Sequence, residues 1–377
     1  MSKYKIMTPG PVQVPENVRL ARSISTTNAD LDPQFYDEYK ETCELISKLL
    51  HTKNETLILS GEGILGLEAA CASMTEPGDR VLILDNGIYG AGFADFVSMY
   101  GGIPVMYTKD YKNAFDVDEL DAYLKEDHDF KYATVVHCDT PSGMLNDIHK
   151  ICPLLKSYGI MTVTDSVSGM FGNEVDVDKA QIDILCGGSQ KAVSAPPGLT
   201  FVTISDEAKA AMENRKTPIA SFYCNLTIFK DYYKNLWFPY TMPISDIYGL
   251  KAAIDNIAAD KNLIKRHAKI ANATREALKE FGIKLHLESG FSDTVTVFDV
   301  PEGMTADDIL KRMREEHHIM LAGSFGDLAG KVIRIGHMGA SANVGDMLEV
   351  MSGLEETLRY LGWKSEKSLL KSFHDKL

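Results

Sequence analysis

The chain has 377 residues, of which 45% are hydrophobic and 9% aromatic, so it can bury a substantial core and form one large domain with a smaller one. Its formal net charge of -14 disfavours a polyanionic partner, because nucleic-acid-binding proteins usually concentrate Lys and Arg on one face. Residues 2–5 are polar, unlike a signal peptide, and no apolar run reaches the ~20 residues that span a bilayer. We therefore expect a cytoplasmic protein with no nucleic-acid or membrane partner.

The chain contains six cysteines, and none of them forms a Cys-x-x-Cys pair of the kind found in metal sites and redox enzymes. Several lie within apolar stretches that are typical of strands or helices. We therefore expect reduced, buried thiols and assign no metal ligand. The six are Cys43, Cys71, Cys138, Cys152, Cys186 and Cys224.

Between residues 55 and 204, short apolar runs alternate with longer amphipathic ones, a pattern typical of strands and crossover helices in a mostly parallel sheet. The runs VLIL and ATVV are apolar enough for strands that are buried on both faces. Ligands of such sheets bind beyond the carboxyl ends of the strands, and Asp85, Asp139 and Asp165 each follow an apolar run. The expected strands cover residues 80–84, 104–107, 132–137, 161–164, 183–186 and 199–204.

The C-terminal third has a different pattern. Residues 205–236 are mixed and aromatic, and Pro243 opens a long helical stretch that runs to about Phe281. Strands expected at 294–298 and 331–335, with helices near 305–316 and 344–360, suit a smaller α+β domain. We predict an N-terminal arm at residues 1–15, a large α/β domain at 16–255 and a small C-terminal domain at 256–377.

Lys191 is the first candidate for chemistry. It follows an apolar strand in the turn GGSQKA, and a lysine at a strand end faces the ligand edge of the sheet. Partial burial among small residues lowers the pKa of its amine, as imine chemistry requires. Alone, such a lysine is more often a solvated loop residue. Asp165, 26 residues earlier, changes that balance, because an aspartate there can pair with a pyridinium nitrogen and keep it protonated.

Two motifs carry a family resemblance. Residues 165–169 (DSVSG) and 188–198 (GSQKAVSAPPG) resemble the signature of the class V aminotransferases, the alanine-glyoxylate and serine-pyruvate group, and the resemblance extends over nearly the whole chain. It implies a fold-type I enzyme of the aspartate aminotransferase superfamily, with pyridoxal 5'-phosphate or unphosphorylated pyridoxal bound covalently to Lys191. It also implies small amino acid and oxo acid substrates. The expected assembly is a homodimer, or a tetramer built from dimers, with the active site at the subunit boundary.

The resemblance assigns roles to further residues, beside Asp165 and Lys191 as the catalytic pair. Tyr89, in DNGIYG, corresponds to the aromatic residue that stacks on the cofactor ring, and Thr140, in HCDTPSG, to the hydroxyl residue beside the ring 3-hydroxyl. Arg334, in RIGHMG, corresponds to the arginine whose planar fork binds the substrate carboxylate. The remaining expected contacts are Gly61, Glu62, Gly63, Val167 and Gln190 around the cofactor, Phe238 and Thr241 of the partner subunit, and Pro9 and Gly10 on the substrate side.

The expected phosphate site departs from the family pattern at Glu62. The segment LSGEGILG runs from a strand through glycines into a helix, and such a helix start normally binds an anion. The family usually has serine or another neutral donor where Glu62 lies. At about 5 Å and an effective dielectric of about 20, two unit negative charges repel by roughly 3 kcal/mol, or about two decades in affinity. The alternative interpretation is a helix-capping carboxylate beside a water-filled cup.

Phe238 is the second departure, because the family often has a phosphate-binding tyrosine at this position. Both departures occur in the pyridoxamine-pyruvate branch of the family, which uses unphosphorylated vitamin B6 as a substrate. We therefore expect pyridoxamine and pyruvate to give pyridoxal and L-alanine. Phe325 lies where that branch has a second arginine, so recognition of the substrate carboxylate is expected to differ. The alternatives are an alanine-glyoxylate or serine-pyruvate aminotransferase that holds pyridoxal 5'-phosphate tightly, and a non-catalytic binding protein that keeps the fold.

Overall fold

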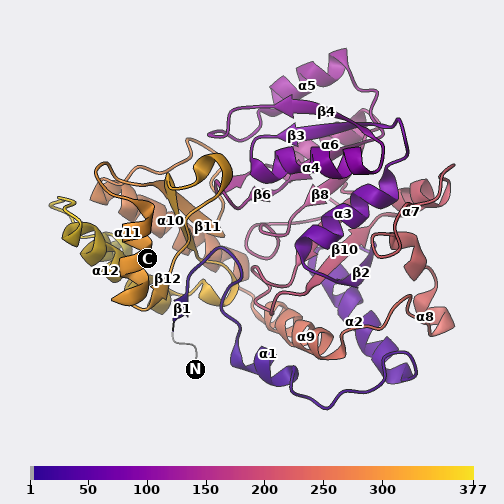
Figure 1. Cartoon of the computed structure of the whole chain (residues 1–377), viewed down its shortest axis with the longest axis horizontal. Coiled ribbons are helices and arrows are strands. Elements are labelled where there is room, and N and C mark those ends of the chain that lie inside the picture. The colour runs from indigo at the N-terminus through magenta and orange to yellow at the C-terminus, as the bar shows by residue number, and fades with distance from the viewer. Residues whose placement is uncertain (1–3) are drawn as a thin grey trace.

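A seven-stranded sheet runs through the larger lobe of the computed structural model, which describes residues 4–377 (Figure 1). Its spatial order is β2-β10-β9-β8-β5-β3-β4, and all neighbouring strands are parallel except β10, which is antiparallel to β2 and β9. The expected α/β architecture is confirmed, and the bounds of the six strands predicted for this sheet lie within two residues of the observed ones. The strands are β2 (Glu55–Ser60), β3 (Arg80–Asp85), β4 (Ile103–Thr108), β5 (Tyr132–Val136), β8 (Met161–Asp165), β9 (Ile184–Gly188) and β10 (Leu199–Ile204).

Strands β5, β9 and β10 form the buried centre of this sheet, because every one of their residues is buried. Aliphatic and β-branched side chains fill such strands when helices cover both faces of a sheet. The edge strand β4 leaves Ile103 and Met106 exposed. Because the parallel strands end at one edge, the structure brings Asp85, Asp139 and Asp165 to the same side of the sheet.

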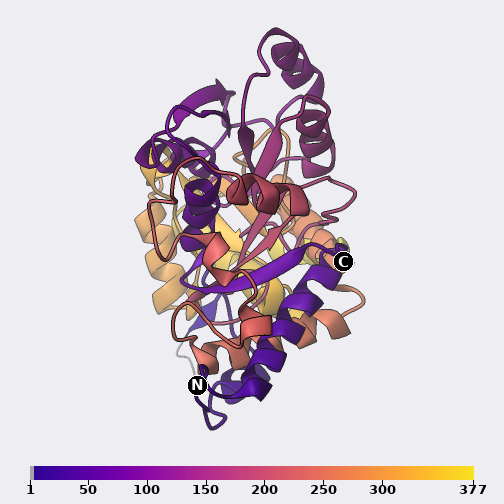
Figure 2. The ribbon, with the colours of Figure 1, turned by 90° about the vertical axis from the view of Figure 1, so that its right-hand side faces the viewer.

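The helices of the larger lobe pack against this sheet, and Figure 2 views them with the C-terminal elements behind. Helix α3 contacts β8, β9 and β10, α4 contacts β3 and β4, and α6 contacts β5 and β8. A Cβ atom at Gly66 would lie 2.5 Å from Oγ1 of Thr200, so α3 needs glycine there to approach the sheet this closely. The helices are α1 (Glu16–Ala21), α2 (Pro33–Leu49), α3 (Gly63–Met74), α4 (Ile88–Met99), α5 (Val117–Glu126), α6 (Ile148–Ser157), α7 (Asp206–Glu213), α8 (Tyr232–Asn235) and α9 (Ile244–Ala259).

The smaller lobe, drawn in orange and yellow in Figure 1, has its own hydrophobic core. Strands β11 (Val295–Asp299) and β13 (Val332–Gly336) pair antiparallel, as expected for an α+β unit. Its helices are α10 (Leu263–Phe281), α11 (Ala306–Glu315), α12 (Val344–Tyr360) and α13 (Leu369–Asp375). Large side chains of its core include Phe281, Phe298, Met313, Met351 and Phe373.

The N-terminal segment contacts both lobes. Strand β1 (Lys5–Ile6) pairs in parallel with β12 (Ile319–Met320), and Met7 belongs to the core of the smaller lobe. Val12 belongs to the core of the larger lobe. Residues 7–12 therefore cross from one lobe to the other. The division at residues 15 and 255 stays a proposal, which the two separate hydrophobic clusters support.

The predicted single helix from Pro243 to about Phe281 is wrong. The structure has two helices, α9 and α10, separated by residues 260–262. The Asp260 side chain accepts the N–H of Asn262 at 3.0 Å and contacts the guanidinium of Arg266. Asp and Asn side chains compete with the backbone for helical hydrogen bonds, and a three-residue interruption is too short to disturb the apolar pattern.

All six cysteines are free and buried, as the sequence predicts. Burial raises the pKa of the Cys138 thiol, which therefore stays protonated at neutral pH. Within residues 4–377, none of the helices has the length and apolar character needed to cross a membrane.

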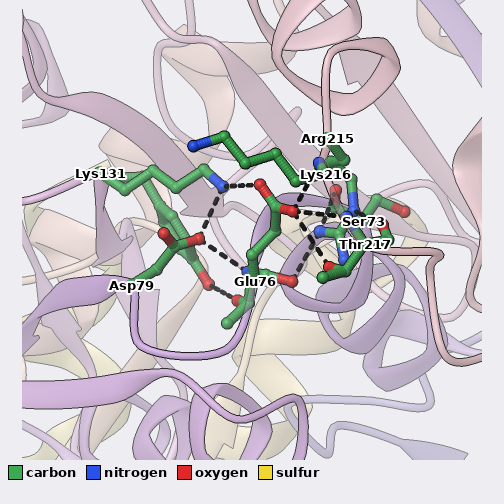
Figure 3. A network of polar contacts seen from close by, with 9 residues as sticks. Ser73, Glu76, Asp79, Lys131, Arg215, Lys216 and Thr217 are labelled. Carbon is green, nitrogen blue, oxygen red and sulfur yellow. Dashed lines mark hydrogen bonds and ion pairs between the residues drawn. The ribbon is translucent and has the colours of Figure 1, made fainter.

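A polar network ties the segment that follows α7 to the end of α3 (Figure 3). The Glu76 carboxylate accepts the N–H groups of Lys216 at 2.7 Å and Thr217 at 2.8 Å, and the Lys131 ammonium lies 3.3 Å away. Asp79 accepts from the same Lys131 at 2.6 Å. The network therefore fixes the loop at Lys216 and Thr217, which lies outside any helix or strand.

This network predicts a pH-dependent stability. Burial raises the pKa of Glu76, but the hydrogen bonds from Thr217 and Lys216 and the charge of Lys131 outweigh it and lower that pKa from 4.5 to about 2. A carboxylate with a depressed pKa stabilises the fold above its ordinary pKa, and the contribution is lost as pH falls through about 4.5 towards about 2. Glu76→Gln should therefore destabilise the protein by roughly 1–3 kcal/mol at neutral pH.

Denaturant unfolding followed by circular dichroism at neutral pH and near pH 3 measures this effect. The difference between Glu76→Gln and the unmodified protein should shrink at the lower pH, because the carboxylate is then largely protonated in the unfolded chain. The exposed Glu126 supplies the control, and Glu126→Gln should be close to neutral at both pH values. An undiminished difference at low pH would contradict the role given to the Glu76 charge.

Candidate active site

A cavity of about 550 Å³ opens at the carboxyl edge of the large sheet, beside the first turns of α3 and α4. Nine of the predicted site residues line it, and most come from strand ends and helix starts that lie far apart in the sequence. Pro9, Gly61 and Arg334 lie next to this set, whereas Phe238 and Thr241 do not line the cavity. The nine are Gly10, Glu62, Gly63, Tyr89, Thr140, Asp165, Val167, Gln190 and Lys191.

Lys191 projects from the turn after β9 across to the N-terminal segment. Its Nζ donates to the carbonyl oxygen of Pro9 at 2.6 Å, and a Cβ atom at Gly10 would lie 2.7 Å from the same Nζ. Glycine at position 10 is therefore required by this close approach. Burial lowers the pKa of Lys191 from 10.5 to about 8, and Arg334 adds to the effect. The amine is thus partly neutral near physiological pH, as a nucleophile must be.

This lowered pKa predicts how covalent binding of pyridoxal depends on pH. The neutral amine reacts with an aldehyde, so the binding rate should rise with pH through about 8 and level off above about 9. An unperturbed lysine amine, with a pKa of 10.5, would still gain reactivity above about pH 10. Stopped-flow absorbance over a series of pH values measures the rate. The Lys191→Ala variant supplies the background, and a rate that climbs without a plateau up to about pH 10 would contradict this environment.

Asp165 ends β8 at the floor of the cavity. One carboxylate oxygen accepts the N–H of Val167 at 2.9 Å. Burial raises the pKa of Asp165 to about 7, and the Val167 N–H and the Lys191 charge offset only part of that effect. A pyridinium N–H would supply the missing positive partner. A Cβ atom at Gly63 would lie 2.8 Å from the methyl groups of Val167, so this wall of the cavity is closely packed.

Tyr89 lies in the first turn of α4, where Asp139 fixes it. Oδ1 of Asp139 accepts the N–H of Tyr89 at 2.9 Å, and Oδ2 accepts the hydroxyl of Ser142 at 2.6 Å. Asp139 is almost completely buried, and burial raises its pKa. This predicted strand-end carboxylate therefore orients the aromatic residue. Asp85, the other one, accepts two side-chain hydroxyl groups and does not line the cavity.

Arg334 reaches the site from β13 in the smaller lobe. Its Nε donates to the carbonyl oxygen of Gly323 at 2.6 Å, and its NH1 lies 3.4 Å from the carbonyl oxygen of Thr140. The guanidinium is thus held beside the cavity wall with further N–H groups available. His337, three residues on, uses both ring nitrogens, towards Thr296 at 2.8 Å and the Asp293 carbonyl at 3.2 Å. These two contacts give His337 a structural role.

Glu62 lies immediately before α3 in an extended conformation and does not cap the helix with its side chain. Its carboxylate has one side-chain contact, with Nε2 of Gln190 at 3.4 Å, within residues 4–377. Oε1 of Gln190 is buried and has no hydrogen-bond partner in the same range. The start of α3 therefore presents carboxylate and amide acceptors where the family pattern would place phosphate donors.

Phe238 is buried within its own chain. Its ring stacks on Tyr36 at 4.4 Å between centroids and meets Tyr39 edge-on at 5.0 Å, so this aromatic cluster fixes the segment that precedes α9. Thr241 is exposed. The single chain does not bring either residue to its own cavity.

Besides the exposed Asp95, the sequence reasoning missed two buried polar residues of the cavity wall, Cys138 and Ser168. Both are almost completely buried, and the Sγ of Cys138 lies 3.7 Å from Oγ1 of Thr294 in the smaller lobe. Cys138 directly follows the strand run that ends at His137, so its strand-end position was a usable signal. Its protonated thiol does not suit a nucleophile.

The residues of the cavity fit the pyridoxal ring, whereas the acceptors at the start of α3 disfavour its phosphate. Asp165 suits the ring nitrogen, Tyr89 and Val167 suit its faces, and Lys191 suits the aldehyde. At the other end, the acceptors of Glu62 and Gln190 would repel a dianion or leave it unpaired.

Comparisons with known proteins identify the family to which the chain belongs. The model of the aminotransferase class-V family matches residues 18–334. A pyridoxamine-pyruvate transaminase of Mesorhizobium japonicum is 33% identical over 347 residues, which cover 89% of this chain and 86% of that protein. An alanine-glyoxylate aminotransferase of Callithrix jacchus is 30% identical over 368 residues, 94% of this chain and 87% of that protein. A solved ureidoglycine-glyoxylate aminotransferase of Bacillus subtilis has a TM-score of 0.95 at 28% identity, covering 100% of this chain and 98% of that chain.

A lysine and an aspartate at the carboxyl edge of this sheet, on a fold shared with solved aminotransferases, define a fold-type I transferase with pyridoxal-phosphate-dependent chemistry. The chain belongs to the class V aminotransferase family, and it is an enzyme that transfers amino groups.

Proposed function

We propose that this aminotransferase takes unphosphorylated vitamin B6 as a substrate and converts pyridoxamine and pyruvate to pyridoxal and L-alanine. One observation carries the proposal: Glu62 and Gln190 offer acceptors at the start of α3. A hydroxymethyl group can donate a hydrogen bond to such acceptors, whereas a phosphate repels them. The similarity to a pyridoxamine-pyruvate transaminase supports the same assignment.

The roles of the chain's own residues follow from their positions. The pyridoxal ring, when bound, withdraws electrons from the carbon at which the amino group is exchanged. Asp165 keeps the ring nitrogen protonated, and Tyr89 covers one face of the ring. Lys191 holds the aldehyde form covalently and, once a substrate amine has displaced it, moves a proton between the two carbons that exchange the amino group. Arg334 binds the carboxylate of pyruvate.

We further propose a cytoplasmic homodimer. Phe222, Tyr223, Leu236 and Trp237 are each about half exposed and lie in one segment of the larger lobe, and exposed apolar side chains in such numbers are typical of an interface. Six free cysteines suit a reducing compartment.

A steady-state assay with pyridoxamine and pyruvate tests the function directly. We expect equal amounts of pyridoxal and L-alanine to form, and pyridoxamine 5'-phosphate to be used at least about 100-fold less efficiently, in line with the repulsion at Glu62. Faster use of the phosphorylated amine would contradict the proposal. Exchange of amino groups between alanine and glyoxylate by protein that retains pyridoxal 5'-phosphate would indicate the alternative function instead.

A further inference from the structure

Phe325 presents an aromatic ring between two residues of the candidate site. Its centroid lies 6.1 Å from the ring of Tyr89 and 5.9 Å from the guanidinium carbon of Arg334. The side chain is nevertheless 43% exposed. Arg334 is the proposed carboxylate-binding residue. The exposed aromatic face beside it offers an apolar surface to the substituent of a bound carboxylic acid.

Two hydrogen bonds fix the segment that leads into Phe325. Arg334 donates to the carbonyl oxygen of Gly323 at 2.6 Å, and the hydroxyl of Ser324 donates to the carbonyl oxygen of Pro141 at 3.2 Å. The first contact lies within the smaller lobe, and the second reaches the turn of the larger lobe that carries the cavity wall. The ring is therefore held at the seam between the lobes, on the side from which Arg334 approaches.

The charges near the ring favour one type of substrate. Residues 323–327 contain no cation and one carboxylate, Asp327. Arg334 would already be paired with the carboxylate next to the reacting carbonyl. A second carboxylate on the substrate would meet an aromatic face without a cation of this loop to pair with, whereas an alkyl group would cover the ring and remove apolar surface from water.

We propose that Phe325 is a specificity-determining residue that selects 2-oxo acids with an uncharged alkyl substituent and disfavours dicarboxylic oxo acids and glyoxylate, which has no substituent. This inference rests on the proposed function only in assigning the oxo acid's carboxylate to Arg334. Pyruvate is the smallest acid of the selected class, and 2-oxobutanoate and 4-methyl-2-oxopentanoate extend it.

Variants at position 325 test the proposal through relative kcat/KM values. Phe325→Ala should lower kcat/KM for 4-methyl-2-oxopentanoate about 10-fold, with a smaller loss for pyruvate and a change of less than about 2-fold for glyoxylate. Phe325→Leu keeps an apolar surface and should recover most of the loss. Tyr360, an exposed aromatic residue of the smaller lobe, supplies the control, and Tyr360→Ala should leave the ratios unchanged. Equal losses for all acids, or no recovery in Phe325→Leu, would overturn the proposal.

A binding measurement separates this proposal from the function proposed above. Unreactive monocarboxylates need no amine donor, so isovalerate and formate can be titrated calorimetrically whatever the enzyme's donor is. Isovalerate should bind about 10-fold more tightly than formate to the unmodified protein, and the difference should disappear in Phe325→Ala. Equal affinities in the unmodified protein would overturn the role of Phe325 even if pyridoxamine and pyruvate are turned over. Failure of that turnover alone would count only against the proposed function.

Discussion

Replacing Glu62 with serine is expected to raise the affinity for pyridoxal 5'-phosphate about 100-fold. The carboxylate lies at the start of α3, where exposed N–H groups and the positive end of the helix dipole otherwise favour an anion. At about 5 Å and an effective dielectric of about 20, its repulsion of one phosphate charge is worth roughly 3 kcal/mol. Once the charge is removed, the intrinsic preference of the helix start for an anion should remain.

The same substitution should weaken the binding of pyridoxamine. The hydroxymethyl group would lose its acceptor, and we expect the dissociation constant for pyridoxamine to rise by about 10-fold. Equilibrium dialysis with each vitamer measures both changes. Asp95→Asn is the control. Asp95 also lines the cavity and is exposed, so this change removes a charge from the cavity without altering the start of α3. An equal gain in phosphate affinity in Asp95→Asn would show that general charge, rather than Glu62, excludes the phosphate.

Replacing Lys191 with alanine should lower kcat for amino transfer by roughly four orders of magnitude or more. The variant loses both the amine that binds the aldehyde covalently and the base that moves the proton. Pyridoxal should still bind reversibly, because Asp165, Tyr89 and Glu62 remain. Product formation measured under saturating substrate gives the loss in kcat.

The exposed Lys179 supplies the matched control for Lys191. Lys179→Ala should keep full activity, since this lysine does not line the cavity. Methylamine added to Lys191→Ala should restore part of the rate if the missing group is an amine that acts as a base. Lys191→Ala with near-normal turnover would contradict the catalytic assignment and favour a different base.

Much of the fold could be predicted because its signals are local. Runs such as VLIL at residues 81–84 are typical of strands buried on both faces, and β3 follows the run to within one residue. Asp165 and Lys191 end two such runs, and parallel neighbours bring strand ends to one edge, so their proximity followed from topology. The role of Asp165 in the reaction stays a prediction.

Other features depend on contacts between side chains that the pattern of apolar residues in the sequence does not predict. The break between α9 and α10 rests on side-chain hydrogen bonds of Asp260. Asp139 and Asp165 both follow apolar strand runs in the sequence. Asp139 nevertheless has a different role, because its carboxylate accepts the N–H of Tyr89 at the start of α4. The buried position of Phe238 within its own aromatic cluster, and the ring of Phe325 between two site residues, arise from packing between distant segments.

Competition between the two vitamers for Lys191 tests the central claim most directly. The purified protein is incubated with equal amounts of pyridoxal and pyridoxal 5'-phosphate, the bound aldehyde is reduced with borohydride, and the peptide that contains Lys191 is weighed by mass spectrometry. We predict that the pyridoxyl form of Lys191 predominates. A Lys191 peptide that carries mainly the phosphorylated form would contradict the account.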